Sequence, residues 1–279
     1  MVDMMTPHTW LITGTSSGLG LALTRRALAA GHRVVATTRS GTFPVEDPQL
    51  TVVRLDPADR AQCRRAVDEA LRATGRLDVL VNNAGYGLVG AVEEVSEAEA
   101  RAILDVDLLG PMWTTQAALP VMRGQGRGHI VQISSTGGVG AMPFLGLYNA
   151  AKWALEGFSE ALAAEVQQMG IRVTLAEIGA MDTQWATSGM RFSQPLGDYD
   201  ELREQVLGTA TVPWPGEPGA TGGGASPDDI ARDILTHVAA GSGPLRLVLG
   251  DGAAEQITTV LDRRRQDYAT QPGFQHLQD

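Results

Sequence analysis

The fold is decided by residues 9–20, which read TWLITGTSSGLG. The first five residues are mostly apolar and predict a short buried strand. Gly14, Gly18 and Gly20 follow, and glycines at this spacing let the backbone turn tightly and approach a pyrophosphate closely. Apolar residues then recur at helical spacing until Gly31, where a helix is expected to end. A strand, a glycine loop and a helix in this order predict a βα unit whose helix N-terminus binds the phosphates of a dinucleotide.

The same alternation of short apolar runs and longer amphipathic runs continues along the chain. We expect six more strands, at residues 33–37, 51–55, 78–81, 129–133, 171–177 and 245–249. We expect helices between most of them, with a capping box at Ser96 and Glu99, a stop at Gly170 and a start at Ser226-Pro227. Repeated βα units predict an α/β protein, a single Rossmann-type domain over residues 1–279 with a doubly wound parallel seven-stranded sheet.

One stretch, residues 181–225, breaks this rhythm. It contains several prolines, the run Gly222-Gly223-Gly224 and large apolar side chains such as Trp185 and Trp214. A long irregular insertion in a compact domain is more often functional than not, and aromatic side chains are unfavourable to leave in water. We therefore expect a lid over a substrate site, with a disordered surface loop as the alternative.

The composition limits the possible classes of protein. The chain has 279 residues, 43% of them hydrophobic, which fits one domain with a large core. Its net charge of −10 argues against nucleic acid or an anionic membrane as a partner. Cys63 is the only cysteine, and neither a signal peptide nor an apolar run of about 20 residues is visible, so we expect a cytoplasmic protein. The five histidines are scattered, which predicts no metal site.

The basic residues are unusual in kind. Of the 22 lysines and arginines, 21 are arginine, and Lys152 is the single lysine. Most surface cations can be either residue, whereas a compact ammonium that can shift its pKa cannot be replaced by a planar guanidinium. The pattern predicts that position 152 requires an ammonium group.

The end of the second strand indicates which dinucleotide is bound. NAD-binding proteins usually carry an acidic residue there, which accepts a hydrogen bond from the ribose 2′-hydroxyl. This chain has Thr38 and Arg39 instead, a hydroxyl and a guanidinium that would hold a 2′-phosphate. We therefore predict NADP(H), with NAD the less favoured cofactor and a solvated loop charge as the other interpretation of Arg39. Asp56 ends the third strand and could accept from the adenine amino group or form a turn with Pro57.

The candidate catalytic groups lie further along the chain. Tyr148 and Lys152 are four residues apart on an expected helix, so they share one face. A nearby ammonium favours the phenolate and is expected to lower the pKa of the tyrosine from about 10 towards neutrality, where it can act as a general acid or base. Ser135 ends a parallel strand at the edge where such sheets bind ligands, and there it could donate to a carbonyl oxygen.

Taken together, the glycine loop, Asn82-Asn83-Ala84-Gly85, Ser135 and Tyr148-Asn149-Ala150-Ala151-Lys152 resemble the motif set of short-chain dehydrogenases/reductases. The motifs stand in family order and at family spacing over roughly residues 8–185. The resemblance is to NADP-preferring members, among them hydroxysteroid and retinol dehydrogenases and ketoreductases. It implies that Lys152 also binds the nicotinamide ribose, and that the remaining cofactor contacts come from Gly14, Thr15, Ser16, Ser17, Gly18, Leu19, Gly20, Asn83, Ala84, Gly85, Gly179 and Thr183. It also implies a homodimer or homotetramer formed through helices near 97–123 and 147–169.

Two positions depart from the family pattern. Asp107 stands where the family usually has an asparagine, whose main-chain carbonyl holds a water that links the catalytic lysine to solvent. An aspartate keeps that carbonyl, and its added charge is expected to raise the pKa of the lysine and so alter that of the tyrosine. Ile178 replaces a proline beside the nicotinamide, where it loses a rigid turn. These departures bear on rate or direction rather than on the fold.

The expected reaction is carbonyl–alcohol interconversion on a small apolar or mixed substrate. The candidate substrate contacts are Ser135 and Tyr148, with a wall formed by Met142, Phe144, Met181, Trp185 and Met190. Those five apolar side chains are equally consistent with an ordinary core. Two other functions fit the same residues: a non-redox enzyme such as a cyclase or epimerase, which would use Tyr148 for proton transfer alone, and a binding protein that senses NADP.

Overall fold

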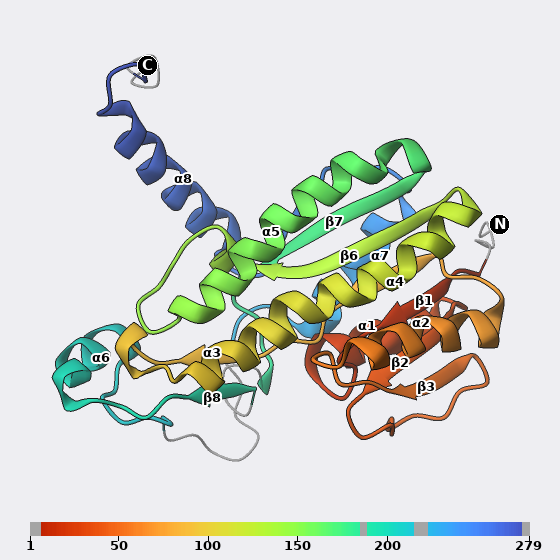
Figure 1. Cartoon of the computed structure of the whole chain (residues 1–279), viewed down its shortest axis with the longest axis horizontal. Coiled ribbons are helices and arrows are strands. Elements are labelled where there is room, and N and C mark those ends of the chain that lie inside the picture. Colours follow the sequence, from red (N-terminus) through yellow and green to blue (C-terminus); the bar gives the residue numbers. More distant parts are fainter. Residues whose placement is uncertain (1–6, 185–188, 215–222, 275–279) are drawn as a thin grey trace.

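The computed structural model describes residues 7–184, 189–214 and 223–274. Its main sheet has seven strands, all paired in parallel, in the order β3-β2-β1-β4-β6-β7-β9 (Figure 1). The strands are β1 Thr9–Ile12, β2 Arg33–Thr38, β3 Leu50–Arg54, β4 Val79–Asn82, β6 Gly128–Ser135, β7 Ile171–Ile178 and β9 Arg246–Leu249. All seven predicted strands are confirmed, with ends that differ by two residues at most.

The direction of winding reverses between β1 and β4. The chain runs outward from β1 through β2 to β3, then returns to the other side of β1 and continues through β4, β6 and β7 to β9. In doubly wound sheets, ligands bind at the carboxyl ends of the strands at such a switch point. The topology therefore places the glycine loop after β1 next to the segment that follows β4.

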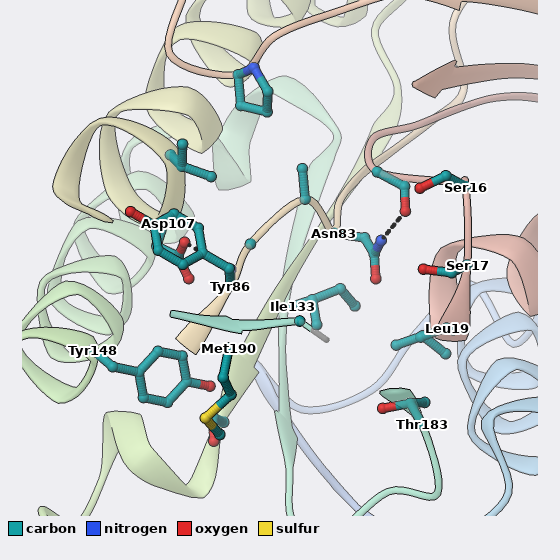
Figure 2. A pocket seen from close by; sticks show the side chains of 18 of the residues that line it. Ser16, Ser17, Leu19, Asn83, Tyr86, Asp107, Ile133, Tyr148, Thr183 and Met190 are labelled. Atoms are coloured by element: carbon teal, nitrogen blue, oxygen red, sulfur yellow. Dashed lines mark hydrogen bonds between the residues drawn. The ribbon is translucent and has the colours of Figure 1, made fainter. Parts of the chain in front are cut away.

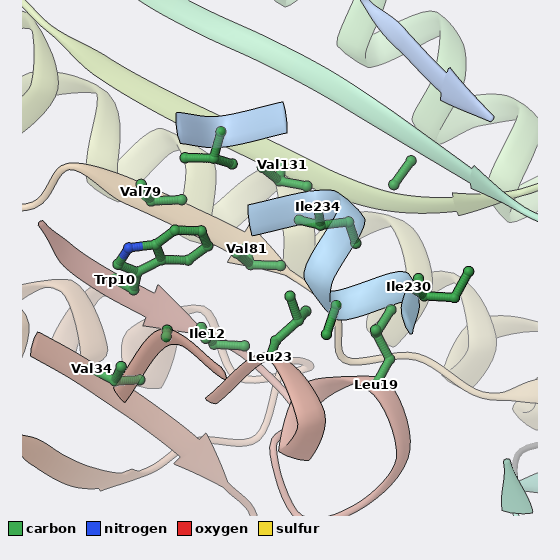
Figure 3. Close-up of a cluster of buried hydrophobic side chains, with 14 of the residues drawn as sticks. Trp10, Ile12, Leu19, Leu23, Val34, Val79, Val81, Val131, Ile230 and Ile234 are labelled. Atoms are coloured by element: carbon green, nitrogen blue, oxygen red, sulfur yellow. The ribbon is translucent and has the colours of Figure 1, made fainter. Parts of the chain in front are cut away.

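Helices cover both faces of the sheet. The helices are α1 Gly18–Ala29, α2 Arg60–Thr74, α3 Glu97–Leu104, α4 Gly110–Gln125, α5 Gly146–Val166, α6 Asp200–Leu207, α7 Pro227–Ala239 and α8 Ala253–Ala269. Helices α1 and α7 pack on one face, where Leu23 and Ile234 meet Ile12 and Val81 of the sheet in one fully buried cluster (Figure 3). Helices α2, α4 and α5 pack on the other face around Leu11, Leu80 and further buried residues.

Local signals explain where these helices begin and end. Ser96 and Glu99 form the predicted capping box of α3, and the Ser226 hydroxyl accepts from the N–H of Asp228 at the start of α7. Gly75 ends α2 at φ +76°, a left-handed conformation that favours glycine. These ends of α2, α3 and α7 are therefore fixed by their own sequences as well as by packing.

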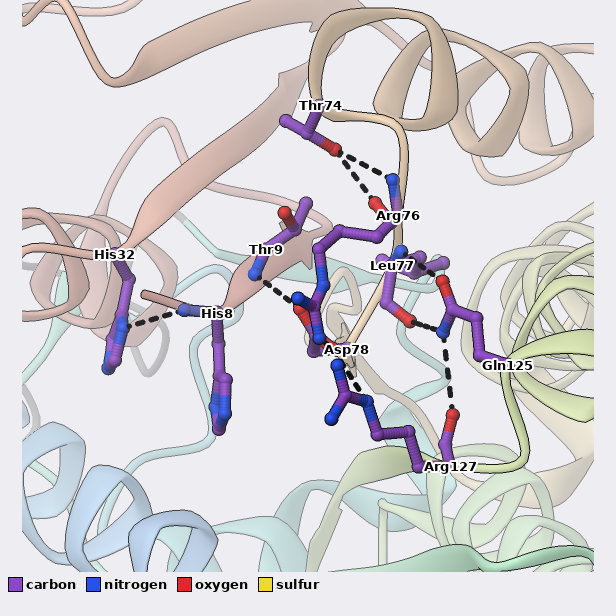
Figure 4. Close-up of polar contacts among 9 residues, drawn as sticks. All are labelled: His8, Thr9, His32, Thr74, Arg76, Leu77, Asp78, Gln125 and Arg127. Carbon is purple, nitrogen blue, oxygen red and sulfur yellow. Dashed lines mark hydrogen bonds and ion pairs between the residues drawn. The ribbon is translucent and has the colours of Figure 1, made fainter. Parts of the chain in front are cut away.

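The amino ends of the strands are held by polar side chains. The Asp78 carboxylate accepts from the N–H of Thr9 at 2.9 Å and lies in ion pairs with Arg76 and Arg127. Gln125 at the end of α4 bonds both the N–H and the carbonyl of Leu77 (Figure 4). These contacts lock β1, β4 and α4 together at the edge opposite the candidate site.

The region expected to be irregular has more order than predicted. Strand β8, Met190–Phe192, pairs in parallel with β5, Gly87–Val89, in a separate two-stranded sheet. Beyond β8, the guanidinium of Arg203 in α6 forms an ion pair with Glu94, and both side chains are 1% exposed. The described part of residues 181–225 is thus anchored to the chain that follows β4. Among the described helices, none is long and apolar enough to cross a membrane.

Candidate active site

A cavity of about 790 Å³ lies at the carboxyl ends of the central strands. Its wall includes the glycine loop, the ends of β2 and β3, the segment after β4, and one face of α5. This is the position that the switch point of the sheet predicts for a ligand.

The glycine loop has the shape that a dinucleotide phosphate requires. Gly14 has φ +69°, and a Cβ there would lie 2.7 Å from Cα of Ala84. A Cβ on Gly20 would lie 2.3 Å from the Gly14 carbonyl oxygen. Ser17 precedes α1 without a side-chain cap, so the N–H groups of the first helical turn are left for an anion. These features fit a bound pyrophosphate.

The segment after β4 braces this loop. The Asn83 amide donates to the carbonyls of Thr13 and Gly14 at 2.9 and 3.0 Å. The Thr13 hydroxyl in turn accepts from the N–H groups of Asn83 and Ala84. Asn82 points the other way and donates to Thr115 and Gln132, which ties β4 to α4 and β6. The four-residue motif therefore fixes the loop geometry and contributes Asn83, Ala84 and Gly85 to the cavity wall.

Two of the predicted loop contacts do not reach the cavity wall. Thr15 is fully buried, and its hydroxyl and N–H both donate to the carbonyl of Thr37. Gly20 allows the loop to pack closely, because a Cβ at this position would collide with the Gly14 carbonyl oxygen. The loop residues that do line the cavity are Gly14, Ser16, Ser17, Gly18 and Leu19.

The end of β2 brings Thr38 and Arg39 to the cavity, as predicted from the sequence. Thr38 is 3% exposed, and its hydroxyl donates to the carbonyl of Thr42 and accepts from the N–H of Gly41. That hydroxyl therefore closes a turn, whereas the Arg39 side chain is exposed at the cavity. Asp56 also lines the cavity and accepts from the N–H of Ala58 at 3.1 Å.

Three candidate catalytic side chains meet on the wall formed by α5 and β6. The ammonium of Lys152 lies 5.7 Å from the centre of the Tyr148 ring, and each residue is 6% exposed. The Lys152 ammonium donates to the carbonyl of Ile133 at 3.2 Å. Ser135, at the end of β6, shares a side-chain hydrogen bond with Tyr148. The four-residue spacing and the strand end thus bring Ser135, Tyr148 and Lys152 together.

The pKa of Tyr148 shifts in the direction opposite to the one predicted from the sequence. Burial raises the pKa of this phenol above its ordinary value of 10, and the nearby charge of Asp107 adds to the rise. Lys152 and the hydrogen bond with Ser135 lower it but do not outweigh burial. The helical spacing predicted that the Lys152 ammonium lies near Tyr148. It could not predict the burial of the phenol, because the surrounding side chains come from segments distant in the sequence.

Asp107 makes a contact that the sequence did not predict. It lies in a turn of π-helix, Asp105–Leu109, between α3 and α4. Its side chain is 0% exposed, and Oδ2 forms an ion pair with the Lys152 ammonium at 3.3 Å. Burial lowers the pKa of Lys152, but the charges of Asp107 and Tyr148 outweigh it, so that pKa is raised. The expected direction of the lysine shift is therefore confirmed, with the carboxylate as its direct cause.

The apolar side chains predicted to form the substrate wall do not all line the cavity. Met181 and Met190 line the cavity, and Figure 2 shows Met190 and Tyr148 among the side chains of its wall. Met142 is 43% exposed and outside the cavity wall. Phe144 is buried away from it, against Val89 and Ala91, and its backbone has φ +67°. Trp185 lies outside the described residues.

The sequence analysis missed Tyr86 as a wall residue. It follows Gly85 at the end of β4, lines the cavity, and stacks under the Arg191 guanidinium at 4.5 Å. The sequence could have indicated this, because Tyr86 closely follows a central strand and ligands bind at the carboxyl ends of such strands.

The expected contacts on the nicotinamide side are also at the cavity. Gly179 and Thr183 both line it, and the Thr183 side chain faces Gly18 of the glycine loop. A Cβ on Gly179 would lie 2.8 Å from the carbonyl oxygen of Asp251, so close packing requires glycine there. Ile178, which replaces the family's proline, is part of the same wall.

A doubly wound parallel sheet, a glycine loop at its switch point and a tyrosine–lysine pair across the cavity define a Rossmann-fold protein with the layout of a dehydrogenase. The sequence model described as short chain dehydrogenase matches residues 8–191. The chain belongs to the short-chain dehydrogenase family of oxidoreductases.

Individual relatives agree with this assignment. The chain is 37% identical to oxidoreductase BOA17 of Botryotinia fuckeliana, with 88% of this chain and 90% of the relative covered. It is 34% identical to a 3-ketodihydrosphingosine reductase of Bacteroides thetaiotaomicron, with 88% and 89% covered. A short-chain dehydrogenase structure from Streptomyces avermitilis superposes with a TM-score of 0.81 at 35% identity, over 95% of this chain and 96% of that one.

Proposed function

We propose that the chain is an NADP(H)-dependent oxidoreductase that interconverts a carbonyl and an alcohol on a small apolar or mixed substrate. The observation that carries this proposal is the meeting of Ser135, Tyr148 and Lys152 on the cavity wall that also contains the glycine loop. The Bacteroides relative is named as a 3-ketodihydrosphingosine reductase, which supports the same type of chemistry here.

Each of the three side chains takes part in the proposed reaction. Ser135 donates a hydrogen bond to the carbonyl oxygen of the substrate, and Tyr148 gives that oxygen its proton. Lys152 holds a positive charge near the phenol and binds the ribose of the cofactor. A nicotinamide dinucleotide held by the glycine loop and Lys152 would supply the hydride for the carbonyl carbon. In the reverse direction Tyr148 accepts the proton of the alcohol.

A screen of ketones and alcohols with NADPH and NADP⁺, followed by cofactor absorbance, tests this function. We expect absorbance change with apolar ketones. Product formation without a change in cofactor would instead identify a non-redox enzyme such as a cyclase or epimerase. Tight cofactor binding with no chemistry on any substrate would identify an NADP sensor.

The cofactor preference rests on Arg39. We expect Arg39→Asp to weaken NADPH relative to NADH by about 10- to 100-fold in kcat/KM, because it replaces a charge-assisted hydrogen bond to the 2′-phosphate by repulsion. Arg33→Asp is the matched control: it makes the same charge change at the exposed opposite end of β2, outside the cavity wall. An unchanged NADPH/NADH ratio in the Arg39 variant would disprove the cofactor assignment.

Met190 is proposed to limit the size of the substrate beside the reacting carbon. Its strand is held by β5, with Met190 opposite Gly87, and Met190 lines the same cavity as Tyr148. We expect Met190→Ala to raise kcat/KM for bulky ketones relative to small ones by roughly 10-fold, since an apolar group of this size is worth about 1–3 kcal/mol. Met142→Ala, at an exposed position outside the wall, should leave the ratio unchanged. If Met190→Ala and Met142→Ala have the same ratio of kcat/KM for bulky and small ketones, Met190 is not part of the substrate site.

A further inference from the structure

The Asp107 carboxylate is enclosed by two other segments, the chain after β4 and helix α5. Oδ1 accepts from the N–H of Tyr86 at 3.1 Å, and Oδ2 is 3.3 Å from the Lys152 ammonium. A Cβ on Gly85 would lie 2.8 Å from Oδ2, so the chain after β4 passes directly over the carboxylate (Figure 2). The site is closely fitted around a carboxylate that no solvent reaches.

Within the described part of the chain, few other charged groups act on Lys152. Tyr148 and Glu156 face it from its own helix, Asp107 from the π-helical turn, and the carbonyl of Ile133 from β6. The Glu156 carboxylate accepts a hydrogen bond from the Ser134 hydroxyl and lies 3.3 Å from the Arg246 guanidinium. Arg246 therefore already balances the charge of Glu156. Asp107 is therefore the carboxylate that directly faces the lysine. Burial raises the pKa of Asp107, and the Lys152 ammonium and the N–H of Tyr86 oppose that rise by favouring the charged form.

We propose that Asp107 is a positioning residue that balances the charge of Lys152 and thereby holds Tyr148 as a neutral phenol, the form that donates a proton. This inference rests on the proposed function and specifies its direction. An unbalanced ammonium beside the ring would favour the phenolate, whereas a neutral pair does so much less. The site is then organised for carbonyl reduction around neutral pH.

The reaction balances in that direction. The O–H bond of Tyr148 breaks as a new O–H bond forms on the substrate oxygen, while the hydride of a reduced nicotinamide dinucleotide becomes the new C–H bond. The carbonyl compound is reduced to an alcohol, and the phenolate regains a proton from solvent. The raised pKa of Tyr148, caused first by burial and further by Asp107, agrees with this arrangement.

The single lysine of the chain allows a direct test. Protein labelled with ¹⁵N at the lysine side chain gives one ammonium signal, which belongs to Lys152. In the wild-type protein we expect this group to titrate above the ordinary lysine pKa of about 10.4. Titration below that value would overturn the proposal. The signal requires no turnover, so it tests the ion pair even if no ketone in the substrate screen is reduced.

Asp107→Asn removes the negative charge of this side chain but keeps its size and shape. The amide oxygen can still accept from the N–H of Tyr86, but the ammonium loses its counter-charge. We expect the Lys152 signal to titrate at lower pH than in the wild type, because burial is then opposed mainly by Tyr148. We also expect the alkaline fall of kcat/KM for ketone reduction to move to lower pH, since Tyr148 loses its proton more readily beside the remaining charge.

Glu160→Gln is the control, because it removes one negative charge from an exposed position two turns along the same helix. It should leave both the lysine titration and the pH profile unchanged. An Asp107→Asn enzyme with reduced activity but unaltered titration and pH profile would show that Asp107 only supports the local structure, and the proposal would be wrong. If that variant does not fold, the wild-type titration still decides.

Discussion

Tyr148→Phe should lower kcat/KM for ketone reduction by about 10²- to 10⁴-fold, the usual contribution of a positioned general acid. The phenylalanine ring fills the same buried position against Leu88 and Ile103, so the packing of this cluster is kept. What is lost is the hydroxyl that shares a hydrogen bond with Ser135 and donates the proton. The measurement is steady-state kinetics with NADPH and a ketone from the substrate screen.

The affinity for NADPH should change little in this variant, because the glycine loop and Lys152 remain. Fluorescence titration with NADPH measures it. Tyr268→Phe is the matched control, since it removes a hydroxyl from a side chain that is 57% exposed on α8. Retention of more than a tenth of the wild-type activity by Tyr148→Phe would show that another group supplies the proton.

The direction of the Tyr148 shift also fixes the pH dependence. A general acid works in its protonated form, so reduction should persist through neutral pH and fall only as pH rises through the raised pKa of the phenol. Alcohol oxidation needs the phenolate and should increase over the same alkaline range. Had the pKa been lowered towards neutrality, the fall in reduction and the rise in oxidation would both occur around neutral pH instead of in the alkaline range.

The sheet was predictable because its signals are local. Each central strand is a short apolar run, and helix ends are marked by residues such as Ser96, Gly75 and Ser226, which act within one turn of themselves. The glycine loop was predictable for the same reason, since strand, loop and helix are consecutive. Side chains on one helical face, such as Tyr148 and Lys152, follow directly from that helix.

Contacts between distant segments could not be predicted in this way. Strands β5 and β8 have three residues each and lie about a hundred residues apart, so no period in either one shows that they pair. Met142 and Phe144 are apolar and near Tyr148 in sequence, yet the loop turns one to solvent and the other into a different cluster. The burial that raises the pKa of Tyr148 and the reach of Asp107 to Lys152 likewise depend on the packed structure.

Lys152→Arg should reduce kcat/KM by at least about 100-fold, although it preserves the positive charge. The ammonium is enclosed by the carbonyl of Ile133 at 3.2 Å and the carboxylate of Asp107 at 3.3 Å, with 8% of its side chain exposed. A guanidinium is larger and planar, so it must displace one of these partners or the phenol itself. Kinetics and NADPH titration on the same preparation measure the loss, which should affect both turnover and cofactor affinity.

The reverse exchange provides the control. Arg101→Lys changes an arginine on α3 whose ion pair with Glu97 is largely exposed, and activity should be unchanged because either cation can occupy such a position. If Lys152→Arg were also near normal, a positive charge of any shape would suffice at 152. The presence of a single lysine among 22 basic residues would then have no connection with the chemistry, and the argument for an ammonium at this position would fail.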